Sequence, residues 1–306
     1  MMRIKNVDFE IDNVCDEDIF ICSLGYEVRS FYLFNQIRKK IKKNNVIILC
    51  FEEFKTKYKE LYAEIADDYT IKCVTYDSGE EIEEVIIDYV QEKKNGTVYI
   101  DYSSMPRNWY ARLPFSLYDN CHMQCVFLYV SGKYPGNYEA YPSAGINSYS
   151  SVGMTAARVD KKRLHIIGLG YDVIRTKALI TILDPDRFCV CYAHEENDTE
   201  MLENVYNVNN QIISESISQV KFCINDFEFM VAKICEIVRE NMSLGDVILV
   251  PDGPKPLIMA MSLVPQIIGE EGVVCLFVSR NVLNYESVDV EPTNKILGFQ
   301  LLNEKI

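Results

Sequence analysis

Polar and basic residues gather in two loops of each half of the chain, and their types suit the binding of a phosphate or another anion. Each loop follows a short apolar run, so that backbone N–H groups at the start of the next helix can face a ligand. A few cations make one cleft positive even on an acidic protein. The candidate ligand-binding residues are Gly25, Tyr26, Glu27, Arg29, Asp101, Ser103, Ser104 and Arg107 in the first half and Gly170, Tyr171, Asp172, Arg175, Asp252, Gly253 and Lys255 in the second.

The second loop of each half carries most of this chemistry. Ser103 and Ser104 can cap the helix that follows, and Gly253 lets the backbone approach a ligand closely. Arg107 and Lys255 add a positive charge at matching places. The alternative is an ordinary strand-to-helix turn, in which each cation pairs with the aspartate of its own loop.

The first loop of each half is acidic as well as basic. Glu27 and Asp172 each follow a tyrosine, and they either hydrogen-bond a ribose hydroxyl or cap the next helix. Gly168 and Gly170 begin a dinucleotide-type GxG, but the third glycine is missing and Ser23 holds the first place in the other half. The absence of a GxxxxGK[ST] loop argues against ATP hydrolysis of the P-loop kind.

The histidines and cysteines indicate neither a metal site nor a catalytic nucleophile. His122, His165 and His194 have no partner at ligand spacing and assemble no Ser–His–Asp or Cys–His set. The 11 cysteines include no CxxC pair, and the grouping of Cys121 and Cys125 lacks the second half of a zinc site. We therefore expect buried, reduced thiols, no metal and no cofactor, and we assign no catalytic residue.

The elements that position these loops recur along the chain, which predicts an internal duplication. Three segments return in the same order at a separation of about 145 to 151 positions. The matching pairs are residues 21–28 with 167–173, 97–107 with 247–255, and 125–131 with 273–279.

Short apolar runs alternate with helical patterns in both halves, as in right-handed βαβ crossovers. Helical patterns in the first half place Phe31, Phe34, Ile37 and Ile41 on one face, then Tyr58, Leu61 and Ile65, then Ile82, Val85, Ile86, Tyr89 and Val90. Strands are expected near 19–24, 46–51, 70–76, 97–101, 125–131, 164–169, 187–192, 219–224, 246–251 and 273–279, and second-half helices near 173–183, 198–208, 227–242 and 256–265. The predicted fold class is α/β, with two tandem Rossmann-like, doubly wound parallel sheets.

In an open parallel sheet, ligands bind outside the carboxyl ends of the strands, at the switch point where neighbouring crossovers leave on opposite faces. With the common strand order 3-2-1-4-5, that point lies between the first and fourth strands of each half. These two strands lead into the two loops described above. Residues about 75 positions apart in the sequence are therefore expected to converge there.

The domain boundaries follow from the repeats. Repeat 1 is expected over residues 1–132 and repeat 2 over 163–283, with a C-terminal extension at 284–306 that packs on one of them. Residues 133–162 are rich in Tyr, Ser, Gly and Pro and are expected to form either a linker or a lid. On a lid, the tyrosines would offer flat faces for stacking bases.

Composition limits the classes of function. The chain has 306 residues, 48% of them hydrophobic, and a formal net charge of −14, which argues against a protein that wraps long nucleic acid. The N-terminus turns acidic by Asp8 without an apolar stretch, and no run approaches the ~20 apolar residues of a membrane span. We expect a cytoplasmic protein with no membrane partner.

The layout of these loops resembles the CARF superfamily, the Rossmann-like sensor domains of CRISPR-associated proteins, and the related SAVED sensors with paired CARF-like units. Residues 252–259 look like the family's threonine-glycine-glycine-threonine-lysine segment, with Gly253 and Lys255 on its glycine and lysine. The threonines are missing, and Pro254 and Pro256 stand nearby. Residues 101–107 keep only the polar and basic character of that segment.

The resemblance implies a nucleotide sensor of a prokaryotic antiviral defence or stress pathway, whose ligand is a nucleotide, including a cyclic oligonucleotide, or another small phosphorylated compound. In that reading Arg29, Arg107, Arg175 and Lys255 bind phosphates, while Tyr26, Tyr171 or linker tyrosines stack bases. A second hypothesis is a metal-independent enzyme on nucleotides or phosphodiesters, either ring-nuclease-like or nucleoside-processing. A third is a non-catalytic interaction subunit of a defence complex. An effector protein on another chain would be the partner of a sensor.

Overall fold

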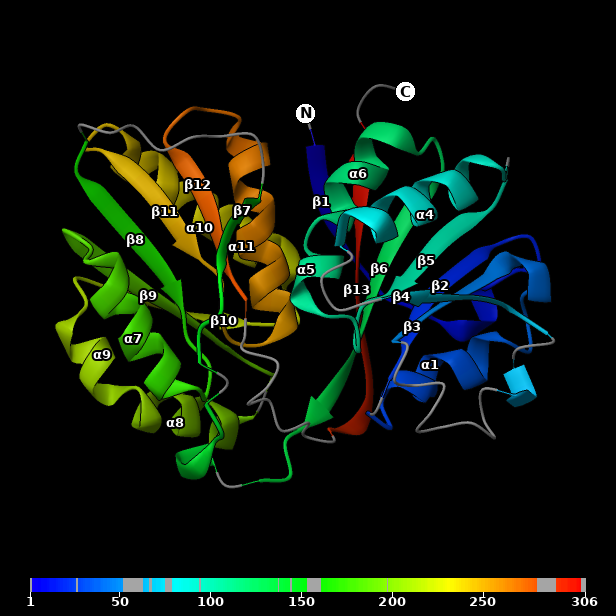
Figure 1. Cartoon of the computed structure of the whole chain (residues 1–306), viewed down its shortest axis with the longest axis horizontal. Coiled ribbons are helices and arrows are strands. Elements are labelled where there is room, and N and C mark those ends of the chain that lie inside the picture. The colour runs from blue at the N-terminus through cyan, green and yellow to red at the C-terminus, as the bar shows by residue number, and fades with distance from the viewer. Residues whose placement is uncertain are drawn as a thin grey trace. The chain divides into compact units, whose positions relative to one another are not determined.

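The computed structural model describes residues 2–25, 27–51, 63–65, 68–74, 79–93, 95–136, 138–143, 145–152, 161–196, 198–279 and 290–303. The chain divides into two compact units. Unit 1 comprises Met1–Pro135 and Ser287–Ile306, and unit 2 comprises Gly136–Glu286. Each unit is an α/β fold built on one mixed sheet (Figure 1).

Unit 1 contains a seven-stranded sheet with the order β1-β13-β6-β5-β2-β3-β4. The strands from β6 to β4 run parallel, whereas β13 is antiparallel to both β6 and β1. The strands are β1 (Met2–Val7), β2 (Ile19–Leu24), β3 (Val46–Phe51), β4 (Thr70–Val74), β5 (Thr97–Asp101), β6 (Gln124–Lys133) and β13 (Glu291–Asn303). The helices are α1 (Ser30–Ile37), α4 (Gly79–Gln91), α5 (Arg107–Tyr110) and α6 (Leu113–Asn120), with short 3₁₀ turns at Ile11–Asn13 and Lys43–Asn45.

Unit 2 contains a six-stranded sheet with the order β10-β9-β8-β11-β12-β7, in which β7 pairs with β12 antiparallel and the others are parallel. The strands are β7 (Tyr149–Val152), β8 (Arg163–Gly168), β9 (Arg187–His194), β10 (Gln219–Cys223), β11 (Asp246–Val250) and β12 (Val273–Val278). The helices are α7 (Val173–Leu183), α8 (Thr199–Val208), α9 (Asn210–Glu215), α10 (Phe227–Met242) and α11 (Lys255–Ile268), and η3 is a 3₁₀ turn at Tyr138–Ala140.

The core of each unit lies between its sheet and the helices that cover it. In unit 1, Phe20, Cys22 and Leu24 of β2 pack with Leu33 and Phe34 of α1 in one cluster. The opposite face of the same strands carries the alternate residues, because successive side chains of a strand point to opposite faces. In unit 2, the corresponding cluster joins β8, β9 and β11 to α7, α8 and α9.

Apolar residues at helical spacing and side-chain N-caps account for the positions of several helices. Ile82, Ile86 and Val90 are buried one turn apart on α4. In unit 2, Asp198 and Asp226 cap α8 and α10, since their carboxylates accept hydrogen bonds from backbone N–H groups of the first turn. Tyr58 and Leu61, which we expected on a helix, lie outside the described residues.

Two predictions about the sheets need correction. The sheets are mixed rather than wholly parallel, because β1, β13 and β7 run antiparallel to their neighbours. The range 133–162, expected as a linker or lid, contributes β7 to the sheet of unit 2. The extension 284–306 was expected to pack on one repeat, and its described part does so as β13, an inner strand of unit 1. Pairing of these strands depends on distant segments, so local sequence patterns do not reveal it.

Candidate functional site

The sheet of unit 1 brings the two predicted loops together at the carboxyl ends of β2 and β5. Cys22 of β2 lies opposite Asp101 of β5, and Asp101 lies opposite Leu128 of β6. The segments that follow these strands are therefore neighbours. We call this region, formed by residues 23–29, 101–107 and 129–131, the unit 1 switch point.

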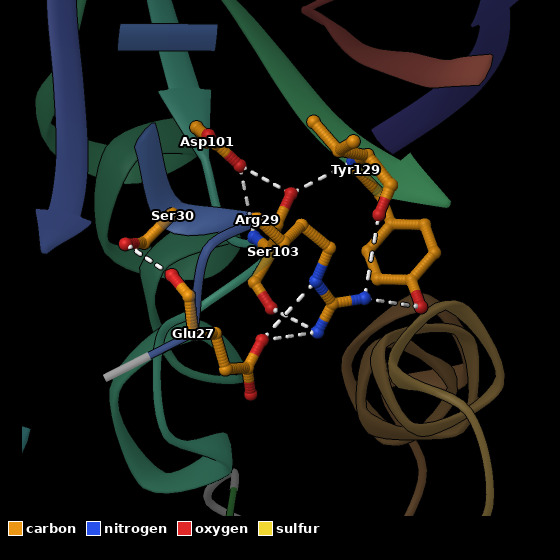
Figure 2. Close-up of polar contacts among 7 residues, drawn as sticks. Glu27, Arg29, Ser30, Asp101, Ser103 and Tyr129 are labelled. Atoms are coloured by element: carbon orange, nitrogen blue, oxygen red, sulfur yellow. Dashed lines mark hydrogen bonds and ion pairs between the residues drawn. The ribbon is translucent and has the colours of Figure 1, made fainter. Parts of the chain in front are cut away.

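Arg29 crosses the unit 1 switch point and contacts all three segments (Figure 2). Its guanidinium donates to the Glu27 carboxylate from Nε at 3.1 Å and from Nη2 at 2.7 Å. Nη2 also donates to the Ser103 carbonyl at 3.0 Å, and Nη1 donates to the Tyr129 hydroxyl at 3.1 Å and the Val130 carbonyl at 3.3 Å. These five hydrogen bonds use all five N–H groups of the side chain.

The surroundings of Arg29 keep its guanidinium both charged and fixed in position. The residue is 4% exposed, and its Cζ lies 5.3 Å from the centroid of the Tyr129 ring. Burial alone would lower the pKa of Arg29, but the nearby oxygens of Tyr129 and Glu27 raise that pKa above its ordinary value. Arg29 therefore holds the switch point together as a charged, paired group, which makes the predicted phosphate-binding role the weaker interpretation of this residue.

Asp101 and Ser103 form a second network within the same region (Figure 2). The Asp101 carboxylate accepts a hydrogen bond from the Ser103 backbone N–H at 2.9 Å and a very short one from the Ser103 hydroxyl. The Ser103 Oγ in turn accepts from the Val130 N–H at 2.7 Å. The prediction that Ser103 and Ser104 cap the next helix is wrong, because α5 begins after Pro106 and receives no side-chain cap.

Three serine hydroxyls at the unit 1 switch point have unmet hydrogen-bonding capacity. The Oγ atoms of Ser23, Ser104 and Ser131 are buried and find no partner among the described residues. Ser23 and Ser131 are 2% and 0% exposed. Their neighbours Cys22, Leu24 and Val130 pack on the α1 side of the sheet, so Ser23 and Ser131 lie on its other face. An unsatisfied buried hydroxyl costs about 1–3 kcal/mol, and few are found in native proteins.

The remaining predicted residues of unit 1 lie around this cluster. Arg107 is buried and is the first residue of α5. Gly25 is buried, and a Cβ added there would meet no atom of the described residues within 4 Å. Tyr26, predicted to stack a base, lies outside the described residues.

In unit 2 the matching loops pack directly against each other. A Cβ added at Gly168 would lie 2.3 Å from the Asp252 carbonyl oxygen, and one at Gly253 would lie 2.5 Å from the Leu169 carbonyl oxygen. Gly170 is also in close contact with Gly253, whose φ is +96°. Gly253 was expected to admit a ligand, but here the glycines admit the backbone of the neighbouring loop.

An ion pair between Arg175 and Asp252 also joins the two loops of unit 2. Its Nη1 lies 3.0 Å from the Asp252 carboxylate, and its Nη2 donates to the Val278 carbonyl at 3.2 Å. The Arg175 side chain is fully buried. Asp172 caps α7, since its carboxylate accepts from the Arg175 N–H at 3.0 Å, which confirms the helix cap among its two expected roles. Glu27 instead pairs with Arg29 through its side chain.

Tyrosines from the expected linker cover the loop after β8. The ring centroids of Tyr138 and Tyr141 lie 4.5 Å and 5.9 Å from that of Tyr171. Burial raises the pKa of the Tyr171 hydroxyl, with smaller contributions from neighbouring groups. Lys255 is half-buried at the start of α11, directly after Pro254, which is the N-cap residue. The tyrosine predicted to stack a base is therefore engaged with rings of its own unit.

Sequence reasoning missed the residues of β6 that complete the unit 1 switch point. The Tyr129 hydroxyl accepts a hydrogen bond from Arg29, and the Val130 N–H donates one to Ser103. Ser131 adds a buried hydroxyl. The signal that could have found them is the third repeated segment, because Val130 matches Val278, the residue that Arg175 contacts in unit 2.

No group of three or more His, Cys, Asp or Glu side chains in the described residues is placed to hold a metal ion. Among the described helices, none combines the length and the apolar character needed to cross a bilayer.

Comparison with known proteins adds little to this description. No protein-family model matches the sequence, and no curated protein is similar to it. Among solved structures, the cytoplasmic domain of a prokaryotic cation chloride cotransporter is similar at 8% identity and a TM-score of 0.23, over 86% of this chain and 96% of that chain. A TM-score this low carries no argument about the function of the chain.

Proposed function

We propose that the chain is a cytoplasmic nucleotide-binding sensor of a prokaryotic defence or stress pathway, and that its ligand binds at the unit 1 switch point. The observation that carries this proposal is a set of three buried serine hydroxyls, those of Ser23, Ser104 and Ser131, that have no hydrogen-bond partner in the described part of the chain. Buried polar groups in native proteins are nearly always satisfied. A ligand that accepts or donates hydrogen bonds there would satisfy them.

The proposal includes the origin of the two units by duplication of one Rossmann-like, doubly wound ancestor. Its support is the strand order, because β4-β3-β2-β5-β6 and β10-β9-β8-β11-β12 follow the same 3-2-1-4-5 pattern along the chain. A second support is that Arg29 and Arg175, each beside the loop after the first parallel strand, bind the carbonyls of the matching residues Val130 and Val278.

The chemistry of the unit 1 switch point suits a nucleotide. Serine hydroxyls both donate and accept, so they can bind phosphate oxygens as well as ribose hydroxyls. Arg107, on the loop that carries Ser104, is the cation that we assign to a phosphate. Arg29 acts as a positioning residue, because its contacts with Ser103 and Tyr129 set the places of the second loop and of β6.

Calorimetry with a panel of linear and cyclic nucleotides tests the proposal. We expect at least one nucleotide to bind, with an affinity that Arg107→Ala and Ser131→Ala each reduce by about tenfold or more, the loss of one good contact. Ser262→Ala is the matched control, because Ser262 is equally buried but donates to the Ile258 carbonyl within α11 of unit 2. No binding of any nucleotide at millimolar concentration would contradict the proposal.

The same samples separate a sensor from an enzyme. Mass spectrometry of the bound nucleotide after incubation would show it unchanged if the protein only senses it. Turnover that Arg107→Ala removes, with the fold intact by circular dichroism, would instead establish the second hypothesis, an enzyme on nucleotides or phosphodiesters. For unit 2, the close contact of its loops favours a structural or partner-binding role.

A further inference from the structure

Two cysteines of unit 1 lie side by side at the junction of α6 and β6. Cys121 is the residue that ends α6, and Cys125 lies at the start of β6. Their Sγ atoms are 3.8 Å apart, and the Cys125 thiol is oriented to donate to the Cys121 sulfur. The Met123 backbone N–H also donates to the Cys121 sulfur, at 3.3 Å.

The surroundings make the two sulfurs chemically unequal. Cys121 is half-buried, whereas Cys125 is 5% exposed. The hydrogen bond from Cys125 and then the one from Met123 lower the pKa of the Cys121 thiol to about 7, against the opposing effect of burial. The same contact and burial raise the pKa of Cys125. The arrangement is that of an accessible nucleophilic sulfur beside a buried partner.

We propose that Cys121 and Cys125 form a reversible dithiol–disulfide switch that responds to peroxide. The inference is independent of the nucleotide proposal, because the pair lies at the amino end of β6, whereas the switch point lies at its carboxyl end. Hydrogen peroxide is the oxidant. A small thiol such as glutathione restores the reduced pair by thiol–disulfide exchange.

The reaction has two steps. The Cys121 thiolate attacks one oxygen of the peroxide, the O–O bond breaks, and hydroxide leaves, so that Cys121 becomes a sulfenic acid. The Cys125 sulfur then attacks the Cys121 sulfur, the S–O bond breaks, and water leaves with the proton of the Cys125 thiol. Both sulfurs are oxidised and the peroxide is reduced to hydroxide and water. Closing 3.8 Å to a disulfide bond of ~2.05 Å moves each sulfur by about 0.9 Å.

Peptide mapping of the full chain after peroxide treatment tests this directly. Trypsin releases residues 113–133 as one peptide, which contains Cys121 and Cys125 and no other cysteine. We expect that peptide to lose two hydrogens and its reactivity toward iodoacetamide, and to regain both with dithiothreitol. Cys50 and Cys73, whose Sγ atoms are 3.3 Å apart, lie on different tryptic peptides, so their oxidation gives a distinct crosslinked product.

Single variants test the assigned roles. Cys125→Ser, which keeps a hydrogen-bond donor beside Cys121 but cannot form a disulfide, is expected to trap the sulfenic acid on Cys121, detected as a dimedone adduct. Cys121→Ser is expected to abolish adduct formation on residues 113–133, because Cys125 is buried. Cys15, an exposed cysteine, is the matched control for simple access. A peptide 113–133 that stays reduced while Cys15 is oxidised, or an adduct on Cys125 in the Cys121→Ser protein, would overturn the proposal.

Discussion

The loops after the first and fourth parallel strands contain similar residues in the two units, but these residues make different contacts. In unit 2, Gly168, Gly170 and Gly253 bring the backbones of two loops into contact, and the buried ion pair of Arg175 with Asp252 joins them. In unit 1, the position that matches Gly168 is Ser23, whose buried hydroxyl has no hydrogen-bond partner among the described residues, and a Cβ at Gly25 would meet none of their atoms within 4 Å. The loops of unit 2 pack directly against each other, whereas three serine hydroxyls at the unit 1 switch point have no hydrogen-bond partner among the described residues, and there we propose that a ligand binds.

The comparison also shows that an arginine at a switch point is not by itself a phosphate site. Arg29 and Arg175 were both expected to bind phosphate, and both are buried and contact protein carbonyl and carboxylate groups. Their role is to tie the first loop to the far strand of the parallel set. The ligand site that we propose in unit 1 is therefore assigned to hydroxyls and to Arg107 rather than to Arg29.

Replacing Arg29 or Arg175 should produce the largest changes in the free energy of unfolding. The size of each change should show in which unit the arginine contributes more to stability. Arg175→Met leaves the buried Asp252 carboxylate without its cation, and we expect a loss of about 3–5 kcal/mol in the free energy of unfolding. Arg29→Met should cost less, because the Glu27 side chain is 13% exposed and water can reach it. Urea denaturation of both variants measures the difference.

Asp252→Asn in the Arg175→Met background is the control for this ranking. Neutralising the stranded carboxylate should recover part of the lost stability, since the penalty comes from an uncompensated buried charge. An Arg29→Met variant that loses as much stability as Arg175→Met would contradict the view that unit 2 is the more tightly closed of the two.

A pair of glycine substitutions sharpens the comparison. Gly253→Ala places a Cβ 2.5 Å from the Leu169 carbonyl oxygen at a φ of +96°, and we expect a destabilisation of about 2–3 kcal/mol. Gly25→Ala meets no atom within 4 Å, so its effect on stability should stay below about 1 kcal/mol and be favourable. Thermal unfolding of the two variants tests both. Equal losses of stability in the two variants would mean that the loops of unit 1 pack as tightly as those of unit 2.

Replacing the unsatisfied serines should stabilise the protein at the expense of binding. Ser23→Ala and Ser131→Ala each remove a buried hydroxyl that bonds to none of the described residues, and we expect a gain of up to about 1 kcal/mol in the free energy of unfolding. Ser103→Ala, which removes two hydrogen bonds, should instead destabilise the chain. Chemical denaturation measures all three. Destabilisation by Ser23→Ala and Ser131→Ala would indicate structural hydroxyls.

A further effect concerns pH and separates unit 2 from unit 1. Burial, aided by the charge of Arg163, lowers the pKa of His165 from 6.5 to about 4, although Asp186 opposes the shift. The unfolded chain therefore binds a proton between these pH values that folded unit 2 excludes. Stability should fall as pH drops from about 6.5 to about 4 and change no further below that through this group.

His165→Gln is the variant for that test, because Gln does not titrate. The corresponding residue of unit 1 is Phe20, so no equivalent effect is expected there. Unfolding free energies of the wild type and of His165→Gln, measured at several pH values in this range, should converge as the pH is lowered. An identical pH dependence in the two proteins would show that His165 is not the titrating group.

Much of the fold was predictable because its strands are short, apolar and bounded by polar loops. The strands expected at 19–24, 46–51 and 97–101 and the helices at 173–183 and 227–242 are confirmed. The antiparallel strands β1, β7 and β13 were not predicted, since their positions depend on pairing with segments far away in the sequence.

The candidate site was predictable in its location but not in its contacts. Repetition and strand order placed Glu27, Arg29, Asp101 and Ser103 together, and the structure brings them within hydrogen-bonding distance. Tertiary packing decides whether the Arg29 guanidinium points to solvent or donates a hydrogen bond to the Val130 carbonyl of β6. A sequence pattern therefore identifies the loop as polar and basic without telling a structural cation from a binding one.

The stoichiometry of nucleotide binding, measured by native mass spectrometry, tests the central claim most directly. We predict one nucleotide per chain, lost in Arg107→Ala and retained in Lys255→Ala, because the ligand occupies unit 1 and the loops of unit 2 occupy each other. Two nucleotides per chain, or binding that Lys255→Ala abolishes and Arg107→Ala preserves, would contradict the account.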